Sequence, residues 1–110
     1  RNFWDQTGSQ WGKGSLIGKP GAAFSSTASL HGGQETTIIS TMFTLLHHGM
    51  ILVGVPYSVP ELVTTVSGGT PYGPSHTAGT QGEIPVNEVE AKICRELGKR
   101  VAEITLQMKK

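Results

Sequence analysis

The sequence is poor in charged residues, aromatic residues and cysteine, and these shortages limit the classes of protein to which it can belong. It has 110 residues with 15% charged residues, a formal net charge of +1, 6% aromatic residues and one cysteine. Since the basic residues are scattered except near the C-terminal end, the chain has no patch able to neutralise many phosphates, and we expect no nucleic-acid partner. One cysteine cannot form an internal disulfide, which is compatible with a reducing compartment, and we expect a cytoplasmic protein.

Long apolar runs are lacking too. The longest, "MILVGV" at residues 50–55, is far shorter than the ~20 residues of a membrane-spanning helix, so we expect no membrane span. The sequence begins "RNFWDQTG", without an initiator methionine or an apolar signal segment. These residues are typical of the last turns of an amphipathic helix, so we expect another half of the protein upstream of Arg1.

What is present is the pattern of an α/β domain. Residues 20–26, "PGAAFSS", are small and apolar, as in a strand that is covered on both faces. Residues 34–48 predict a helix that ends at Gly49, with one apolar stripe formed by Ile38, Ile39, Met42, Leu45 and Leu46. Residues 50–55 predict a second apolar strand. This order predicts two parallel strands joined by a right-handed crossover, within a doubly wound sheet.

A long connection and a second helix follow. The connection, about residues 57–86, contains four prolines, and loops of this length are usually functional or disordered. Its aromatic residues Tyr57 and Tyr72 favour function. Asn87 and Glu90 have the spacing of a capping box, and they predict the start of a C-terminal helix over about residues 87–108. Its apolar face, which we expect to cover the sheet, consists of Val89, Ile93, Leu97, Val101, Ile104 and Met108.

Between the first strand and the first helix lies a polar segment, "STASLHGG". In open parallel sheets, ligands bind beyond the carboxyl ends of the strands, where helix N-termini present free backbone N–H groups. The hydroxyl groups of this segment can donate or accept hydrogen bonds, and Gly32 and Gly33 let the backbone approach a planar ligand. The plainer interpretation is an ordinary Ser/Gly loop that starts a helix, and spacing alone does not decide between the two.

For the histidines, as for the polar segment, a structural and a functional interpretation are both open. His47 and His48 close the helix, where imidazoles complement the helix dipole without any chemistry, or where one of them serves a site. Adjacent helical histidines point about 100° apart, and His31 and His76 have no Asp, Glu or Cys at ligand spacing, so we expect no metal site. Cys94 lies inside the second helix, where we expect a small hydrophobe with no catalytic role.

Five segments together resemble one known family. They are "DQTGSQW", "FSSTASLHGGQETT", "LLHHGM", "VPY" and "GGTPYG", in the order and at the spacing of the WrbA-like family of flavodoxin-like NAD(P)H:quinone oxidoreductases. The resemblance implies a three-layer α/β/α fold with a doubly wound parallel sheet in the strand order 2-1-3-4-5. Residues 1–110 would be the C-terminal part of one such domain, with strands 4 and 5. The first three strands and the phosphate loop would lie upstream.

The resemblance also implies a function. The family binds flavin mononucleotide (FMN), takes electrons from NADH or NADPH, and reduces quinones by two electrons in a ping-pong hydride transfer. The chain would then belong to an NAD(P)H dehydrogenase (quinone), expected to be a homo-oligomer, in particular a tetramer, and to be inactive without its other half. A different class stays open: a flavodoxin-like binding or interaction protein without catalysis of its own.

The family's site residues map onto this sequence by resemblance alone. The loop beside the flavin ring and ribityl chain would consist of Ser26, Thr27, Ala28, Ser29, Leu30, His31 and Gly32, with Leu30 and His31 where many relatives carry glycine. His47 would be the catalytic histidine beside the ring, and Tyr57 a nearby aromatic wall. Trp11 would reach a neighbouring subunit's flavin and form part of the quinone slot. Residues 70–73 would belong to the insertion after strand 5 that forms the rim of the active site and the assembly surface.

Elementary chemistry agrees with these roles. A slot for a flat ring is well formed by aromatic walls. A quinone oxygen that gains negative charge is stabilised by a donor such as an imidazole.

Overall fold

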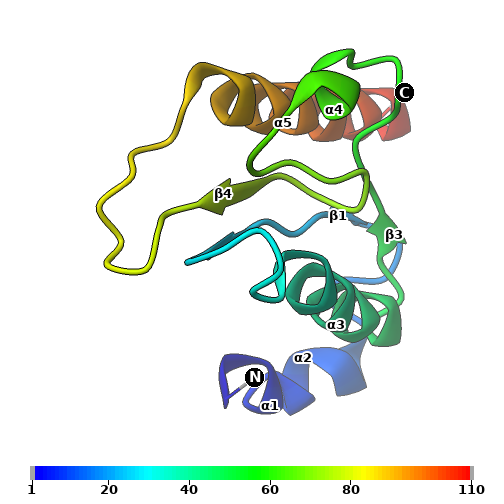
Figure 1. Ribbon diagram of the computed structural model, residues 1–110. Coiled ribbons are helices and arrows are strands. Elements are labelled where there is room, and N and C mark those ends of the chain that lie inside the picture. Colours follow the sequence, from blue (N-terminus) through cyan, green and yellow to red (C-terminus); the bar gives the residue numbers. More distant parts are fainter. Residues whose placement is uncertain (1, 110) are drawn as a thin grey trace.

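The computed structural model describes residues 2–109 and has an α/β fold with short parallel strand pairs. Figure 1 shows α3 on one side of the strands and α5 on the other. The elements are α1 (Asn2–Asp5), α2 (Gly8–Lys13), β1 (Pro20–Gly21), β2 (Ser25–Thr27), α3 (Gln34–His47), β3 (Ile51–Leu52), α4 (Glu61–Thr64), β4 (Ser75–Thr77) and α5 (Glu88–Met108). Within the described residues, no helix combines the length and the apolarity that crossing a membrane requires.

Residues 20–27 take part in both strand pairs, the first with β1 and the second with β2. β1 pairs in parallel with β3, with Pro20 opposite Ile51, and β2 pairs in parallel with β4, with Ser25 opposite Ser75. The predicted parallel pairing of the two strands is therefore confirmed. Residues 20–27 have β3 beside their first part and β4 beside their last part, so the long connection is inserted between two segments that border the same stretch.

The prediction that residues 20–26 form one strand covered on both faces is wrong. The stretch is divided into β1 and β2, and Phe24 is 76% exposed. On the side of α3, Ala23 is buried, whereas on the other side α5 packs against the core beside Ala22 and leaves a cavity of about 250 Å³ next to Phe24. Only one face is therefore covered along its whole length.

Helix α3 matches the predicted helix to within one residue. Its buried apolar residues are Ile38 and Leu45, at a spacing of seven, and the helix packs against β2 and β3. Leu46, predicted in the same apolar stripe, is exposed. The reason is geometric, because Leu46 lies about 100° around the helix from Leu45 and so points away from the strands.

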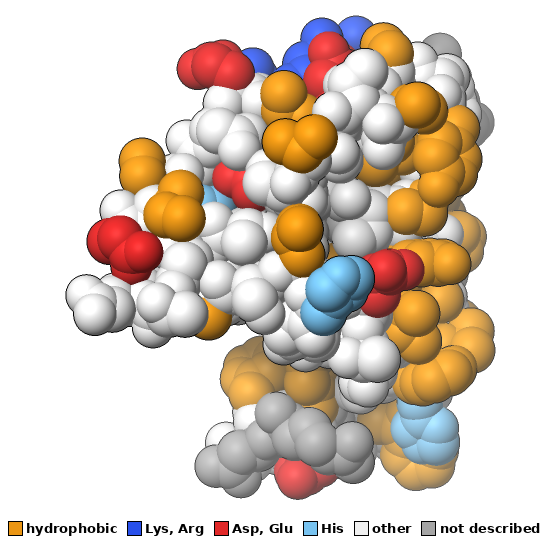
Figure 2. All heavy atoms as spheres, in the orientation of Figure 1, with side chains coloured by type: hydrophobic (Ala, Val, Ile, Leu, Met, Phe, Trp, Pro, Cys, Tyr) orange, Lys and Arg blue, Asp and Glu red, His pale blue; other side chains and the backbone are white. Residues whose placement is uncertain are grey.

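Helix α5 confirms the predicted C-terminal helix. The Asn87 side chain accepts from the Glu90 backbone N–H, and the Glu90 side chain accepts from the Asn87 backbone N–H, which completes the capping box. Ile93 and Leu97 enter the main core with Val53, Val55, Val59 and Leu62. Cys94, expected to behave as a small hydrophobe, is exposed on the helix surface. Lys and Arg side chains gather over α5 on the face shown in Figure 2.

The connection after β3 is more ordered than a plain loop. It contains the short helix α4, which packs on α5, and the strand β4, which returns to pair with β2. Two of its residues, Val59 and Leu62, belong to the core. At the other end of the chain, the predicted helix end takes the form of two short helices, and α2 stops at Gly14, which has a φ of 65°.

Candidate functional site

The polar segment at residues 26–32 lies where the sequence predicted it, between the end of β2 and the start of α3. Most of it is solvent-exposed: Ser26, Ala28, Ser29, Leu30, His31 and Gly32 are exposed, and Thr27 is half-buried. β2 is a parallel strand, so this loop occupies the position in which open α/β sheets bind ligands.

One carbonyl group organises the loop. The Ser29 carbonyl oxygen accepts hydrogen bonds from the Thr27 hydroxyl at 2.8 Å and from the Gly32 backbone N–H at 3.2 Å. The Gln34 side-chain Nε2 lies 3.5 Å from the same oxygen and makes a third, longer contact. These donors come from the strand, the loop and the helix, so the Ser29 carbonyl links all three.

The start of α3 is open to a planar ligand. Gly33 has a φ of 98° in the left-handed region, and no side chain caps the first backbone N–H groups of the helix. A Cβ added at Gly32 would lie 3.0 Å from the Ser29 Oγ, so a side chain there would crowd the loop. Free N–H groups, nearby hydroxyls and a backbone without side chains form a donor set that suits the polar edge of a flavin ring.

At the other end of α3, Trp11 and His47 form a stacked pair. Their ring centroids are 5.3 Å apart and the planes differ by 9°. The Trp11 indole N–H also donates to the His47 backbone carbonyl at 3.1 Å. Both side chains are exposed, Trp11 to 52%. The structure therefore brings together the histidine predicted to lie beside the ring and the tryptophan predicted to reach a neighbouring subunit's flavin, although they are separated by 36 positions in the chain.

Unlike His47, His48 is buried, with only 5% of its surface exposed. The Thr7 hydroxyl donates to the Trp4 carbonyl at 2.6 Å, so the oxygen of Thr7 accepts from the His48 Nε2–H at 2.9 Å. The His48 Nδ1 is buried and has no hydrogen-bond partner among the described residues. His48 thus joins α3 to the N-terminal helices, and the two neighbouring histidines have separate roles.

A cavity of about 470 Å³ lies between the N-terminal helices and α3. Aromatic rings make up much of its wall. Its ring-bearing lining residues are Trp4, Trp11, Phe43, His47 and His48.

Within one chain, His47 is far from the loop at residues 26–32. The two lie at opposite ends of α3, a helix of 14 residues, so they are about 20 Å apart along its axis. One ligand ring cannot touch both ends of this helix in a single chain. Tyr57 is exposed at the beginning of the connection and is not part of the wall of the 470 Å³ cavity.

The turn at residues 70–73, predicted to lie at the rim, is held tightly. The Thr70 hydroxyl donates to the Gly73 carbonyl at 2.8 Å, and the backbone groups of the two residues bond to each other in both directions. A Cβ added at Gly73 would collide with the carbonyl oxygen of Ala23. The turn is therefore packed directly against the stretch between β1 and β2.

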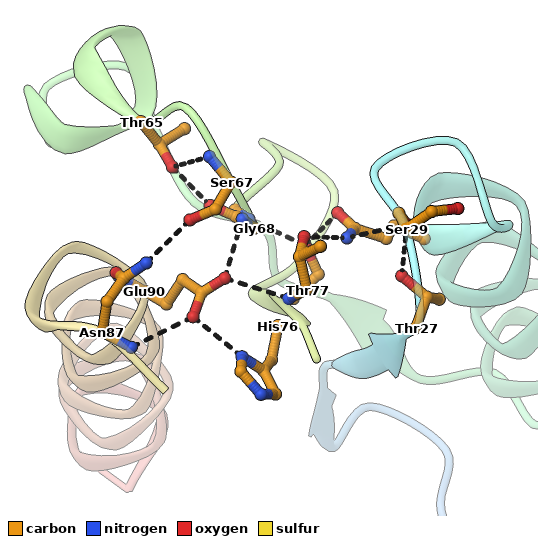
Figure 3. Close-up of polar contacts among 12 residues, drawn as sticks. Thr27, Ser29, Thr65, Ser67, Gly68, His76, Thr77, Asn87 and Glu90 are labelled. Atoms are coloured by element: carbon orange, nitrogen blue, oxygen red, sulfur yellow. Dashed lines mark hydrogen bonds and ion pairs between the residues drawn. The ribbon is translucent and has the colours of Figure 1, made fainter. Parts of the chain in front are cut away.

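Sequence reasoning missed the carboxylate that fixes this connection. Glu90, 2% exposed, accepts from the backbone N–H groups of Gly68 at 2.8 Å and Thr77 at 3.0 Å, in addition to its capping bond with Asn87. Its other oxygen lies 2.8 Å from the His76 Nδ1. Figure 3 shows these contacts converging on Glu90. The capping-box spacing pointed to Glu90 but to only one of these partners.

These contacts keep Glu90 ionised. Burial raises the pKa of its carboxyl group, but the hydrogen bonds from Thr77, His76, Asn87 and Gly68 together outweigh burial and lower the pKa from 4.5 to about 2. Since an ionised carboxylate only accepts hydrogen bonds, the His76 Nδ1 carries the proton.

The described residues contain no group of three or more His, Cys, Asp or Glu side chains that could hold a metal ion. No model of a protein family matches the chain. Two curated relatives do match it closely. Both have the name NAD(P)H dehydrogenase (quinone): one, from Chromohalobacter salexigens, is 56% identical over 98% of this chain, and one, from Trichlorobacter lovleyi, is 54% identical over 98%. The chain is similar to quinone dehydrogenases.

The resemblance predicted from the sequence segments is thereby confirmed. The chain spans about half the length of the curated relatives it matches, 55% and 54%.

Proposed function

We propose that this chain is the C-terminal half of an FMN-dependent NAD(P)H:quinone oxidoreductase with a flavodoxin-like, three-layer, doubly wound sheet. The observation that carries the proposal is the identity of 56% over 98% of the chain to a relative named NAD(P)H dehydrogenase (quinone). In this fold, residues 20–27 would be strand 4, and β3 with β4 would be the two parts of strand 5. The single cysteine is compatible with the cytoplasmic location that we propose.

The loop at residues 26–32 would hold the flavin ring. FMN, when bound, supplies two-electron hydride transfer between NADH or NADPH and a quinone, in ping-pong alternation through one slot. The chain's own contribution is binding and orientation. The free N–H groups at the start of α3 and the Ser26 hydroxyl can donate to the polar edge of the ring, and the Thr27 hydroxyl, whose hydrogen is donated to Ser29, can accept from it. The remaining loop positions can lie along the ring and ribityl chain.

His47 and Trp11 would serve a second subunit. Because His47 is about 20 Å from the loop along α3, both can flank one flavin only if they come from different chains. Their exposed, stacked rings form a flat surface for this purpose. The proposal therefore requires a homo-oligomer, and we propose a tetramer with the symmetric interfaces that such assemblies use.

In that slot, the His47 imidazole would donate a hydrogen bond to the quinone oxygen that gains negative charge. Trp11 would form one wall of the slot by stacking. Tyr57, which is exposed, would supply another aromatic wall.

The test uses the full-length protein. A purified protein that is yellow from bound FMN, and that oxidises NADH or NADPH only when a quinone is present, supports the proposal. Initial rates with varied NAD(P)H at several quinone concentrations should give the parallel lines of a ping-pong mechanism. A protein that binds no FMN and reduces no quinone would instead be a flavodoxin-like interaction protein without catalysis.

A further inference from the structure

Gln34, the first residue of α3, is a buried polar side chain to which neither the sequence pattern nor the proposed function gives a role. It is 4% exposed, although its neighbours in the loop at residues 26–32 are open to solvent. A buried amide must have its donors and acceptor satisfied, because each unpaired group would cost free energy. The partners of Gln34 therefore indicate what it holds.

Both ends of the Gln34 amide bond to β4. Its Nε2 donates to the Thr77 hydroxyl at 2.7 Å, and its Oε1 accepts from the Ser75 hydroxyl at 2.7 Å. Ser75 and Thr77 are two positions apart on a strand, so their side chains lie on the same face. The Gln34 amide thus spans the two hydroxyls along one face of β4.

The same nitrogen reaches the loop. Nε2 has two N–H groups, and with one bonded to Thr77 the other is 3.5 Å from the Ser29 carbonyl oxygen, to which Thr27 and Gly32 also donate. Thr77 is itself held from the other side, because its backbone N–H donates to Glu90. Figure 3 shows Thr77 between Glu90 and Ser29. An unbroken set of contacts therefore connects α5, β4, Gln34 and the loop.

We infer that Gln34 is a positioning residue for the flavin loop: its amide holds the Ser29 carbonyl in register with β4, so that the N–H groups of the loop keep the orientation that FMN requires. The inference rests on the proposed function, since it assigns FMN to this loop. Gln34 acts through Ser29 and does not itself touch the flavin. The inserted connection, through β4, becomes a support for the loop.

The test compares variants of the full-length protein that differ in this contact. Gln34→Leu removes both amide functions at similar volume. Thr77→Val removes only the hydroxyl to which Gln34 donates and keeps a β-branched residue in the strand, so it is the safer variant for folding. Thr41→Val is the matched control, because the Thr41 hydroxyl bonds only to Thr37 within α3 and is not part of the loop contacts.

The first measurement needs no flavin. Hydrogen exchange of the Gly32 backbone N–H, which donates to Ser29, reports how firmly the loop is held. In the protein without FMN, Gln34→Leu should speed this exchange by roughly 10-fold and Thr77→Val by a few-fold, since one or two hydrogen bonds are lost. Thr41→Val should leave it unchanged.

The second measurement is FMN binding, by fluorescence titration, together with the visible circular dichroism of the bound flavin. Gln34→Leu should raise the FMN Kd by roughly 10-fold to 100-fold and change the dichroism at saturation. A role in stability alone would leave the dichroism of the saturated, folded protein as it was. If the Gly32 exchange and the FMN Kd are unchanged in both Gln34→Leu and Thr77→Val, the inference is overturned. If the unsubstituted protein binds no FMN, the proposed function is overturned, and the role of Gln34 toward flavin with it.

Discussion

The two ends of α3 are built from different chemistry. At its first residue, Gln34 is buried, and its polar groups are bonded to β4 and through Thr77 to Glu90 on α5. At its last residue, His47 is exposed and stacks on Trp11, another exposed ring. The polar end is thus fixed by contacts within the chain. The aromatic end keeps exposed ring surface, which is what a site shared with another molecule requires.

The largest effect should come from the aromatic end. In the full-length protein, His47→Gln is expected to slow reoxidation of reduced flavin by quinone by roughly 10² to 10³-fold, because the proposed donor to the developing oxyanion is lost. Reduction of the flavin by NAD(P)H should hardly change. Stopped-flow absorbance, with the two half-reactions followed separately, measures both rates.

The matched control for His47 is its neighbour. His48→Gln should lower the thermal unfolding temperature, because His48 is buried and bonded to Thr7, and it should leave the reoxidation rate of the folded protein nearly unchanged. Similar, nearly normal reoxidation rates in both variants would contradict the proposed catalytic role of His47. It would then be a histidine that only complements the helix dipole, with a stabilising effect of at most about 1 kcal/mol.

The next largest effect tests the polar end of α3, which is connected through Thr77 to Glu90. Glu90→Gln places an N–H donor among N–H groups that now bond to a carboxylate, so it should lower the free energy of unfolding by about 3 kcal/mol at pH 7. The folded pKa of Glu90, about 2, is below its ordinary value of 4.5. Its contribution to stability is therefore fully present above about pH 4.5 and is lost as the pH falls toward 2.

Urea unfolding at a series of pH values from 7 to 2 measures this contribution. The control is Glu103→Gln, the same change at an exposed position of α5, which should alter stability by less than about 0.5 kcal/mol. Parallel stability curves for the unsubstituted protein and for Glu90→Gln over this pH range would contradict the role given to Glu90.

A smaller effect on stability distinguishes the packed turn at residues 70–73 from the N-terminal helices. Gly73→Ala should destabilise the protein by about 1 to 3 kcal/mol, because the new Cβ collides with the Ala23 carbonyl oxygen. Gly12→Ala, in α2 near the aromatic end, meets no atom within 4 Å and should be neutral or stabilise by up to about 1 kcal/mol. Thermal unfolding compares the two. A neutral Gly73→Ala would show that the turn can move away from the strand.

The smallest effect on folding should come from Trp11→Ala. Trp11 is half-exposed, and loss of its stack on His47 should change the free energy of unfolding by about 1 kcal/mol. Assembly should respond more strongly, because the proposed interface uses this ring. Sedimentation velocity at micromolar concentration should detect tetramer in the full-length protein and smaller species in the variant. A flavin-bound protein that sediments only as monomer before any substitution contradicts the proposed assembly.

Several elements could be predicted from the sequence because the signal is local. The apolar repeat at three and four residues predicted α3, and the spacing of Asn87 and Glu90 predicted the start of α5 and its capping box. Strand, helix and strand in sequence predicted a parallel pair. The position of the loop at residues 26–32 followed from the same order, since a loop after a parallel strand must lie at the carboxyl edge of the sheet.

The sequence by itself thus determined the helices α3 and α5 and the parallel pairing of β1 with β3, because backbone periodicity and caps depend on residues a few positions apart. It did not indicate α4 or β4 within the long connection. Only the tertiary structure decided which groups meet. Trp11 stacks on His47 across 36 positions, and Glu90 bonds to Gly68, 22 positions earlier. Whether His47 or His48 is buried was decided by the docking of the N-terminal helices on α3. Such contacts depend on how the whole chain closes on itself, and no spacing between neighbouring residues encodes them.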